Sequence, residues 1–358
     1  MHFKTLFIGL LFLMTFSSNA QNSGNISIKI RTQKKGISIR GLSIPNETTI
    51  WASGSKGSIV YSNDGGDHFN WKPINGYENR DFRSIYAWDD KEAIVAAIAA
   101  PAIVLKTKDG GVTWYKVYEN TDSLIFLDAI HFKNDLEGTI VGDPINHQIF
   151  LLKTMDKGEH WTQIDSSYFK SPLKEGEAFF ASSNSTISHF KQDDFLVTGG
   201  LASRLWINGL AHDMPMIKGE KSTGANSIAI SPNGSTLIIV GGDFSKKEQA
   251  TNNIVGFDHF MMKAPRAKRD PENKDLLKDN WVINKKIGNL HGYKSSVIFL
   301  NNKVILTCGT SGVDWSTNKG KTWNFLSNEP FHVVQKQPGK KAAFLAGSDG
   351  RIGYIGFE

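Results

Sequence analysis

Short runs of alternating hydrophobic and polar residues follow one another along most of the chain, with glycine-rich or polar turns between them. Runs of this kind predict short β-strands. One group of four is especially clear, because residues 126–132, 138–142, 148–153 and 160–164 each have strand character and short turns connect them. Four such strands in succession are typical of one antiparallel sheet of a propeller.

One octapeptide pattern, [Ser/Thr]-x-[Asp/Asn]-x-Gly-x-x-[Trp/Phe], recurs at residues 62–69, 107–114, 154–161 and 316–323. An oxygen at its third position can accept hydrogen bonds from turn N–H groups, and its glycine can adopt a positive φ. The aromatic residue can fill the space between neighbouring sheets. We interpret the pattern as the Asp-box turn and predict a structural role for Asp64, Asp109, Asp156 and Asn318.

The spacing of the pattern indicates the architecture. Asp64, Asp109 and Asp156 follow one another at intervals of 45 and 47 residues, which is the length of a propeller blade. Weaker copies are expected at 203–209 and 252–257. First strands are predicted to begin near Ile39, Arg83, Leu127, Glu177, Ser227, Ser295 and His332.

These starts predict an all-β fold, a seven-bladed β-propeller of four-stranded antiparallel blades. The seventh unit contains only three predicted strands before the chain stops. Residues 26–32 alternate as a strand should, so we expect this N-terminal strand to supply the missing outer one and close the ring.

The N-terminal residues indicate export. Lys4 precedes an apolar run from residue 6 to 16, and small residues follow up to Ala20. We therefore predict a signal peptide at 1–20 and a periplasmic or secreted protein. The run is too short to span a membrane. Residues 21–358 are expected to form a single propeller domain with an insertion loop at about 261–280.

The composition limits the kinds of partner that the protein could bind. The chain has 358 residues and a formal net charge of +6. In residues 263–278, six Lys and Arg residues outnumber three Asp and Glu residues, but no aromatic residues lie among them. This pattern argues against a nucleic-acid site. The single cysteine, Cys308, cannot form a disulfide within the chain and is expected to be a buried thiol.

Common catalytic and cofactor motifs are missing from the sequence. It contains no Gly-x-Ser-x-Gly, Cys-x-x-Cys or Gly-x-Gly-x-x-Gly segment, and its histidines are never closer than thirteen positions apart. We therefore expect no cofactor and no metal. We also expect a monomeric protein.

Charged residues are predicted to gather at a polar mouth, on the face opposite the Asp boxes. This face would carry the loops that enter the first strands and those that link the second and third strands. The residues placed there are Arg40, Arg83, Asp128, Asp143, His147, Glu177, Arg204, Asp243, Lys294, Asp314, His332 and Arg351.

Several of these charges lie where an inner strand would otherwise favour apolar residues, so they should be paired or directed at a ligand. The candidates for ligand or partner binding are Arg83, Asp128, Asp143, Glu177, Arg204, Asp243, Lys294 and His332. The alternative is that such charges only tie the blades together.

Segments in every part of the mature chain carry a family resemblance. They are Trp51–Gly54, Asp81–Arg83, Lys106–Gly111, Val141–Pro144, Glu177–Ser182, Val240–Asp243 and Gly292–Ser295. The chain resembles the photosystem II stability/assembly factor-like family of Asp-box propellers, in its bacterial non-photosynthetic branch.

The resemblance implies a seven-bladed propeller used for binding and assembly. In photosynthetic members, an arginine-rich patch helps to engage a membrane-protein intermediate. Here the basic residues are spread over several blades. We expect a binding protein whose polar mouth takes a protein or glycan ligand.

The competing interpretation is a sialidase-like glycoside hydrolase, which would use the same mouth. Such an enzyme needs an arginine cluster, a tyrosine nucleophile paired with a glutamate, and an acid. The residues that could supply these groups are Arg40, Arg83, Arg204, Arg351, Tyr293, Glu177 and Asp128. This alternative predicts that Glu177 and Tyr293 converge on an arginine cluster.

Overall fold

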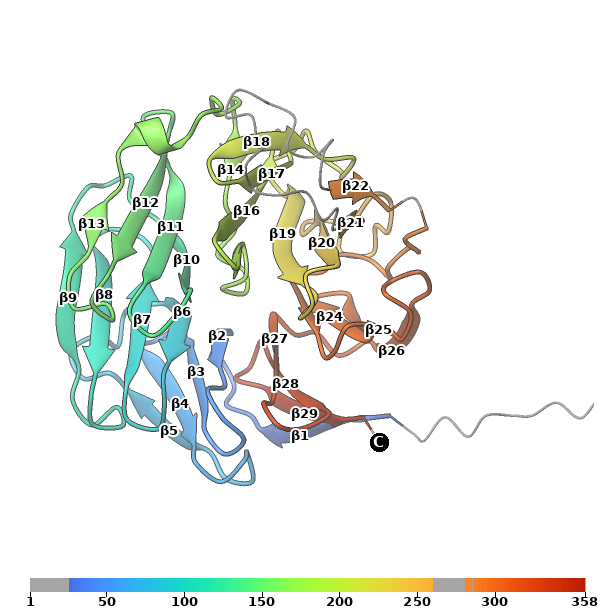
Figure 1. Ribbon diagram of the computed structural model, residues 1–358. Coiled ribbons are helices and arrows are strands. Elements are labelled where there is room, and N and C mark those ends of the chain that lie inside the picture. The colour runs from blue at the N-terminus through green and yellow to red at the C-terminus, as the bar shows by residue number, and fades with distance from the viewer. Residues whose placement is uncertain (1–25, 260–280, 285, 358) are drawn as a thin grey trace, which may run out of the picture.

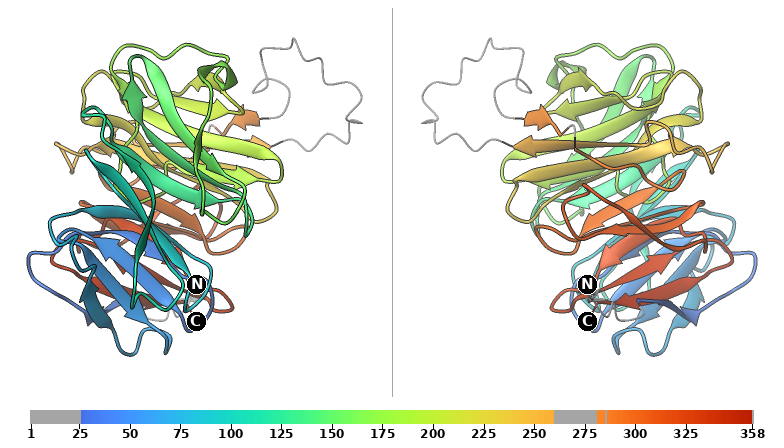
Figure 2. Two further views of the ribbon diagram at one scale, coloured as in Figure 1. Left: turned by 90° about the vertical axis from the view of Figure 1, so that its left-hand side faces the viewer. Right: turned by 90° about the vertical axis from the view of Figure 1, so that its right-hand side faces the viewer.

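The computed structural model describes residues 26–259, 281–284 and 286–357. Its strands form antiparallel sheets that follow one another in chain order around an axis (Figure 1). In side view the sheets stand as separate blades around the ring (Figure 2). The predicted all-β, seven-bladed propeller is confirmed.

The first three blades have four strands each. Blade 1 consists of β2 (Ile39–Ser43), β3 (Ile50–Gly54), β4 (Ser58–Ser62) and β5 (Asn70–Pro73). Blade 2 consists of β6 (Phe82–Ala87), β7 (Ala93–Ala97), β8 (Ala102–Thr107) and β9 (Tyr115–Asn120). Blade 3 consists of β10 (Leu127–Phe132), β11 (Gly138–Ile145), β12 (Gln148–Thr154) and β13 (Thr162–Gln163).

Blades 4 and 5 are joined. A short 3-10 helix, Ser166–Tyr168, precedes blade 4, which consists of β14 (Glu177–Ala178), β15 (Ile187–Phe190), β16 (Asp193–Gly200), β17 (Arg204–Ile207) and β18 (Leu210–Asp213). Blade 5 consists of β19 (Thr223–Ile230), β20 (Thr236–Asp243), β21 (Ile254–His259) and β22 (Trp281–Ile283). The sheets meet at Gly199 and Gly224, where a Cβ on Gly224 would lie 2.4 Å from the Gly199 Cα.

The last blades complete the ring. Blade 6 consists of β23 (Ser296–Phe299), β24 (Ile305–Gly309), β25 (Gly312–Ser316) and β26 (Asn324–Ser327). Blade 7 consists of β27 (Val333–Lys336), β28 (Ala342–Ala346) and β29 (Ile352–Gly356), with β1 (Ile28–Thr32) as its outer strand. The pairing of Ile28 with Ile355 and of Ile30 with Gly353 confirms the predicted closure by the N-terminal strand (Figure 1).

Burial follows the position of each strand within its blade. The second strands β3, β7, β24 and β28 are buried along their whole length, because neighbouring blades cover both faces of them. The outer strands β5, β13 and β26 are largely exposed. The apolar clusters lie between adjacent blades, as where Trp51 of blade 1 packs with Phe82 and Val95 of blade 2. The hydrophobic effect therefore stabilises blade-to-blade contacts.

Blade 4 departs from the predicted pattern. Its expected first strand is broken into β14 and β15, and both pieces pair with β16. Residues between them leave the sheet because their polar groups bond to other blades. The predicted turn copy at 203–209 does link the third and fourth strands. It is a two-residue hairpin turn, with positive φ at both Asn208 and Gly209.

The predicted copy at 252–257 was wrong. Asn252 and Asn253 precede β21, the third strand of blade 5, and so lie at the end of the blade opposite an Asp-box turn. The asparagine pair resembles the motif in composition only. The signal peptide predicted at 1–20 and the insertion predicted at about 261–280 lie outside the described residues.

The segment between β14 and β15 contacts several other blades, and we call its residues Ser182–Ser185 the axial plug. Ser182 bonds to Asn226 of blade 5, and its carbonyl accepts from Arg40 of blade 1. Ser183 donates to the Ser295 carbonyl of blade 6. A loop of this part of the chain reaches toward the centre of the ring (Figure 1).

The rest of the axial plug reaches two more blades. The Asn184 side chain donates to the Ile85 carbonyl of blade 2 at 3.0 Å and accepts from the Ile130 N–H of blade 3 at 2.8 Å. Ser185 bonds to Ser227 of blade 5. Polar groups of the axial plug therefore tie blade 4 to five other blades.

Asn184→Ala should lower the free energy of unfolding by about 2–4 kcal/mol, because it leaves two backbone groups of blades 2 and 3 without a partner. Denaturant unfolding of the protein measures this. The exposed Asn79, whose side chain makes no hydrogen bond to the described residues, provides the control, and Asn79→Ala should change stability by less than about 0.5 kcal/mol. Equal effects of the two substitutions would contradict a bridging role for the axial plug.

Candidate functional site

The inner ends of the blades surround a cavity of about 490 Å³, which we call the axial cavity. All seven blades contribute to its wall, so it lies on the ring axis. The residues used below are Arg40, Arg83, Asp128, Asp143, Phe180, Asn226, Phe244, Tyr293 and His332. Most lie at the starts of first strands or just after second strands. In an antiparallel blade this is the end opposite the turns that join third and fourth strands.

Two arginines from neighbouring blades line the axial cavity. Arg83 donates from Nε to the Asp81 carboxylate at 2.8 Å. Arg40 donates to the Ser182 carbonyl at 3.3 Å and forms no ion pair with the described residues. Burial and the positive charge of Arg83 lower the pKa of Arg40. The cavity thus holds a partly buried guanidinium that forms no ion pair with the described residues.

Two carboxyl groups from blade 3 line the same cavity. Asp128 is fully buried, and neither of its oxygens has a hydrogen-bond partner among the described residues. Burial and the nearby Asp143 raise the pKa of Asp128 well above its usual range. Burial also raises the pKa of Asp143 to about 6, although Asp143 accepts a hydrogen bond from the Phe179 N–H. These carboxyls do not compensate Arg40 as a fixed ion pair would.

Aromatic residues form the apolar part of the wall. Phe244 is half exposed and packs edge-on against Phe180 and Tyr293, with ring centroids 5.8 and 6.3 Å apart. The Tyr293 hydroxyl donates to Asn226. Burial, followed by the charges of Arg40 and Arg83, lowers the pKa of His332 to about 3. The imidazole is therefore neutral at physiological pH.

The candidates Glu177 and Arg204 form a buried pair inside blade 4. Arg204 Nε donates to both Glu177 oxygens at 3.0 Å, and Nη2 makes a further short contact. The Glu177 carboxylate also accepts from Trp206 at 3.0 Å and Thr198 at 2.5 Å. Neither side chain is more than 5% exposed. These contacts give both residues a structural role within the blade.

Lys294 and Asp243 are engaged within their own blades. Lys294 is fully buried and pairs with Asp314 at 2.8 Å, and it also donates to Ser311. Asp243 accepts from the N–H and hydroxyl of Ser245 at the turn after β20. Of the eight candidates, the structure thus brings Arg83, Asp128, Asp143 and His332 to the axial cavity.

The geometry separates the groups that a sialidase would need together. Tyr293 lies with Arg40 and Arg83 at the axial cavity. Glu177 does not line this cavity, and its carboxylate is shared among Arg204, Trp206 and Thr198. A tyrosine nucleophile would need that glutamate as its proton acceptor.

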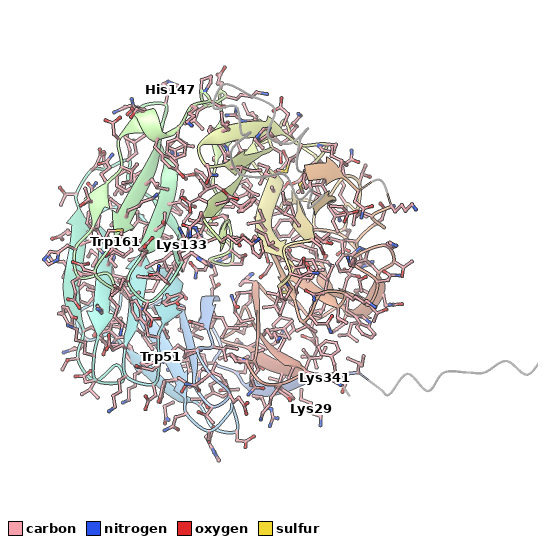
Figure 3. The ribbon with its side chains drawn as sticks, in the orientation of Figure 1. Lys29, Trp51, Lys133, His147, Trp161 and Lys341 are labelled. Carbon is pink, nitrogen blue, oxygen red and sulfur yellow. The ribbon has the colours of Figure 1, made fainter. Side chains whose placement is uncertain are left out.

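A second hollow, of about 610 Å³, adjoins the axial cavity and shares Asp143, Ala178 and Lys221 with it. It runs over the ends of blades 3 and 4 to His147, which lies at the periphery of the ring (Figure 3). Together the two hollows form a groove from the axis to the rim. An extended segment of a partner could lie along such a groove.

The predicted Asp-box residues lie in turns that join third to fourth strands. Asp64, Asp109, Asp156 and Asn318 each accept a hydrogen bond from the backbone N–H four residues later, at 2.9–3.0 Å. The glycine of each turn has a φ of 77° to 87°. These contacts hold the turns, and none of the four residues lines the axial cavity.

Neither a metal cluster nor a membrane-spanning helix is found. In the part of the chain that the structure describes, no three His, Cys, Asp or Glu side chains form a group that could hold a metal ion. The same part contains no helix long and apolar enough to cross a membrane.

Several residues of the cavity wall are not among the eight candidates, and Arg40, Tyr293 and Phe244 are three of them. The sequence places Arg40 at the predicted mouth and offers Tyr293 only for the sialidase alternative. Phe244 follows the Gly-Gly-Asp end of a second strand, and an aromatic residue at that loop position was the signal that could have identified it.

The comparisons with known proteins agree with this fold. No protein-family model matches the chain, and no curated protein sequence does. YCF48 bound to a D1 peptide is structurally similar, with a TM-score of 0.61 and 14% identity, over 95% of this chain and 99% of that one. YCF48 from Cyanidioschyzon merolae has a TM-score of 0.60 and 12% identity, over 92% and 99%.

A propeller of another kind matches almost as well. The β-propeller domain of Cps50 (Swd1) from Myceliophteria thermophila has a TM-score of 0.59 and 10% identity, and the match covers 92% of this chain and 100% of that domain. Identities this low establish a shared fold. The chain is therefore a β-propeller similar in structure to YCF48.

Proposed function

We propose that this protein is an exported binding propeller that holds a segment of a partner protein in the axial cavity and its adjoining groove. One observation carries the proposal: Arg40 is a partly buried cation that forms no ion pair with the described residues, in a cavity that all seven blades help to form. A buried charge is costly unless it is paired. An acidic group of the partner would supply the missing charge beside Arg83.

The shape of the site favours a protein segment. The axial cavity continues into a second hollow, so the accessible surface is longer than a single sugar or metabolite requires. The edge-packed rings of Phe180, Phe244 and Tyr293 offer apolar contact beside the charges, a mixture typical of protein interfaces. The similar YCF48 structure contains a bound peptide of D1. A glycan ligand is the alternative named from the sequence.

Photo-crosslinking tests the site directly. With p-benzoylphenylalanine at position Phe244, which is 50% exposed at the axial cavity, the protein should form a covalent adduct with one partner in the cells that make it. The same reporter at Phe325, which is 49% exposed on the outer strand of blade 6, provides the matched control. Mass spectrometry identifies the adducts.

Charge-removing variants complete this experiment. In the Phe244 reporter protein, Arg40→Ala with Arg83→Ala should abolish the adduct, because the partner's acidic group loses both guanidinium donors. Lys29→Ala with Lys341→Ala removes as much charge from exposed positions on blade 7 and should leave it unchanged (Figure 3). Identical adducts from both reporter positions would contradict the proposal. An adduct that still forms in the Arg40→Ala/Arg83→Ala variant would also contradict it.

Binding should depend on pH through Asp143. The pKa of this group is about 6, so it becomes neutral as the pH falls from 7.5 to 5, and a negative charge near the arginines disappears. Affinity for the acidic partner should therefore rise, by roughly three- to tenfold. Titrations of the purified partner measure this, and Asp143→Asn should flatten the dependence. Weaker binding at pH 5 would instead indicate a basic partner group.

The free energy of unfolding should distinguish an arginine that stabilises the fold, Arg204, from one that is available to a ligand, Arg40. Arg204→Ala strands the buried Glu177 carboxylate and should lower the free energy of unfolding by about 3–5 kcal/mol. Arg40→Ala removes a cation that, among the described residues, has no carboxylate partner and only one long hydrogen bond, to the Ser182 carbonyl, so stability should change by less than about 1 kcal/mol. Urea unfolding of both variants checks this. A loss of stability in Arg40→Ala as large as that in Arg204→Ala would show that Arg40 stabilises the fold.

A further inference from the structure

In four blades, the turn that joins the third and fourth strands packs onto the preceding blade. The glycines of these turns, in blades 1, 2, 3 and 6, lie against a large apolar residue on the second strand of the preceding blade. These residues are Phe344, Trp51, Ile94 and Ile238. Each of these four turns thereby fills the gap to the preceding blade at this end of the ring.

The gap between blades 3 and 4 is not filled in this way. Blade 4 has only the short Asn208–Gly209 turn at this place. Thr139 of blade 3 occupies the position that Ile94 occupies in blade 2, since Thr139 pairs with His131 as Ile94 pairs with Tyr86. Both halves of the usual contact are therefore altered, and a cavity of about 300 Å³ remains, which we call the interblade cavity.

The filled gap between blades 2 and 3 shows which groups this position normally receives. There, the turn of blade 3 inserts Glu159, whose carboxylate pairs with Lys106 and Lys108. The same turn inserts Lys157, whose ammonium pairs with Glu92 at 3.0 Å. One anion and one cation thus enter the gap together.

The interblade cavity contains the counterparts of Lys106 and Glu92. The short turn of blade 4 inserts no counterpart of Glu159 or Lys157 between them. Lys153 and Glu137 of blade 3 correspond to Lys106 and Glu92 of blade 2, and both line the cavity. Lys133 adds a second ammonium, and it lies nearer the ring axis than Trp161 (Figure 3). Lys153 is compensated only in part, because its contact with Asp194 is 3.4 Å long.

His189 provides an independent sign of a ligand. Its side chain is 5% exposed and lines the interblade cavity, and its Nε2 has no hydrogen-bond partner among the described residues. Its Nδ1 lies 2.7 Å from the Asp194 carboxylate. Since a carboxylate only accepts, Nδ1 donates, and Nε2 is left without a partner in a residue that lines the cavity. A polar group of a ligand would supply that partner.

We propose that the interblade cavity binds a small zwitterion of the α-amino acid class. Its carboxylate would pair with Lys153 and Lys133, where Glu159 pairs in the neighbouring gap. Its ammonium would pair with Glu137, as Lys157 pairs with Glu92 in the neighbouring gap. The two lysines, Glu137 and Asp194 have a formal net charge of zero, which suits a ligand without net charge. This site is separate from the axial cavity.

Calorimetric titration of the mature protein tests the site with a panel of single L-amino acids, with acetate and methylammonium as probes carrying only one charge. At least one amino acid should bind with a stoichiometry of one, and neither single-charge probe should match it. Lys153→Met and Glu137→Gln should each weaken binding at least about tenfold, because each removes a charged hydrogen-bond partner. Lys116→Met with Glu119→Gln, on the exposed outer strand β9, should leave it unchanged.

A filled cavity provides the second test. Thr139→Ile rebuilds the apolar residue found in blade 2 and should abolish binding, while circular dichroism shows an unchanged fold. No binding by any amino acid, equal binding of acetate, or binding that persists in Thr139→Ile, Lys153→Met and Glu137→Gln would overturn the proposal. If the partner protein occupies the interblade cavity but no amino acid does, the cavity binds a side chain of the partner. That result would overturn the proposal as well.

Discussion

The axial plug is the contact on which the rest of the structure depends. Four consecutive small polar residues leave the first strand of blade 4 and bond to five other blades. Such bonds are strong only when every buried group is satisfied. Ser182 of the plug also lines the axial cavity. Because its carbonyl is the described partner of Arg40, a guanidinium is held at this cavity without a carboxylate.

Blade 4 is less regular than the other blades, because part of its chain forms the axial plug. Its first strand is interrupted, its outer hairpin is short, and the gap toward blade 3 lacks the packing found elsewhere in the ring. The buried Glu177–Arg204 pair and the direct approach of Gly224 to Gly199 compensate by tying the blade internally and to blade 5. The most irregular blade therefore shapes both cavities. This agrees with the general observation that departures from local regularity concentrate at functional positions.

The periodicity of the sequence predicted the architecture well, because blade length and strand alternation are local properties. The closing role of residues 26–32 could be predicted for the same reason, since an unpaired sheet edge is a local deficit. The site was predicted less completely. Arg83 and Asp143 could be placed by strand position, but the sequence did not show that Arg204 meets Glu177 inside one blade. Nor did it show that Asn184 reaches blades 2 and 3, because such contacts depend on the path of a single loop across the ring.

The most direct test of the central claim is an amide hydrogen-exchange comparison of the free protein with its complex with the cross-linked partner. If the partner lies at the axial cavity and its groove, exchange should slow in the loops at 143–147, 174–182 and 244–248, and the turns at 62–69, 107–114, 154–161 and 316–323 should be unaffected. Slower exchange confined to those turns would place the partner on the opposite face and contradict the account.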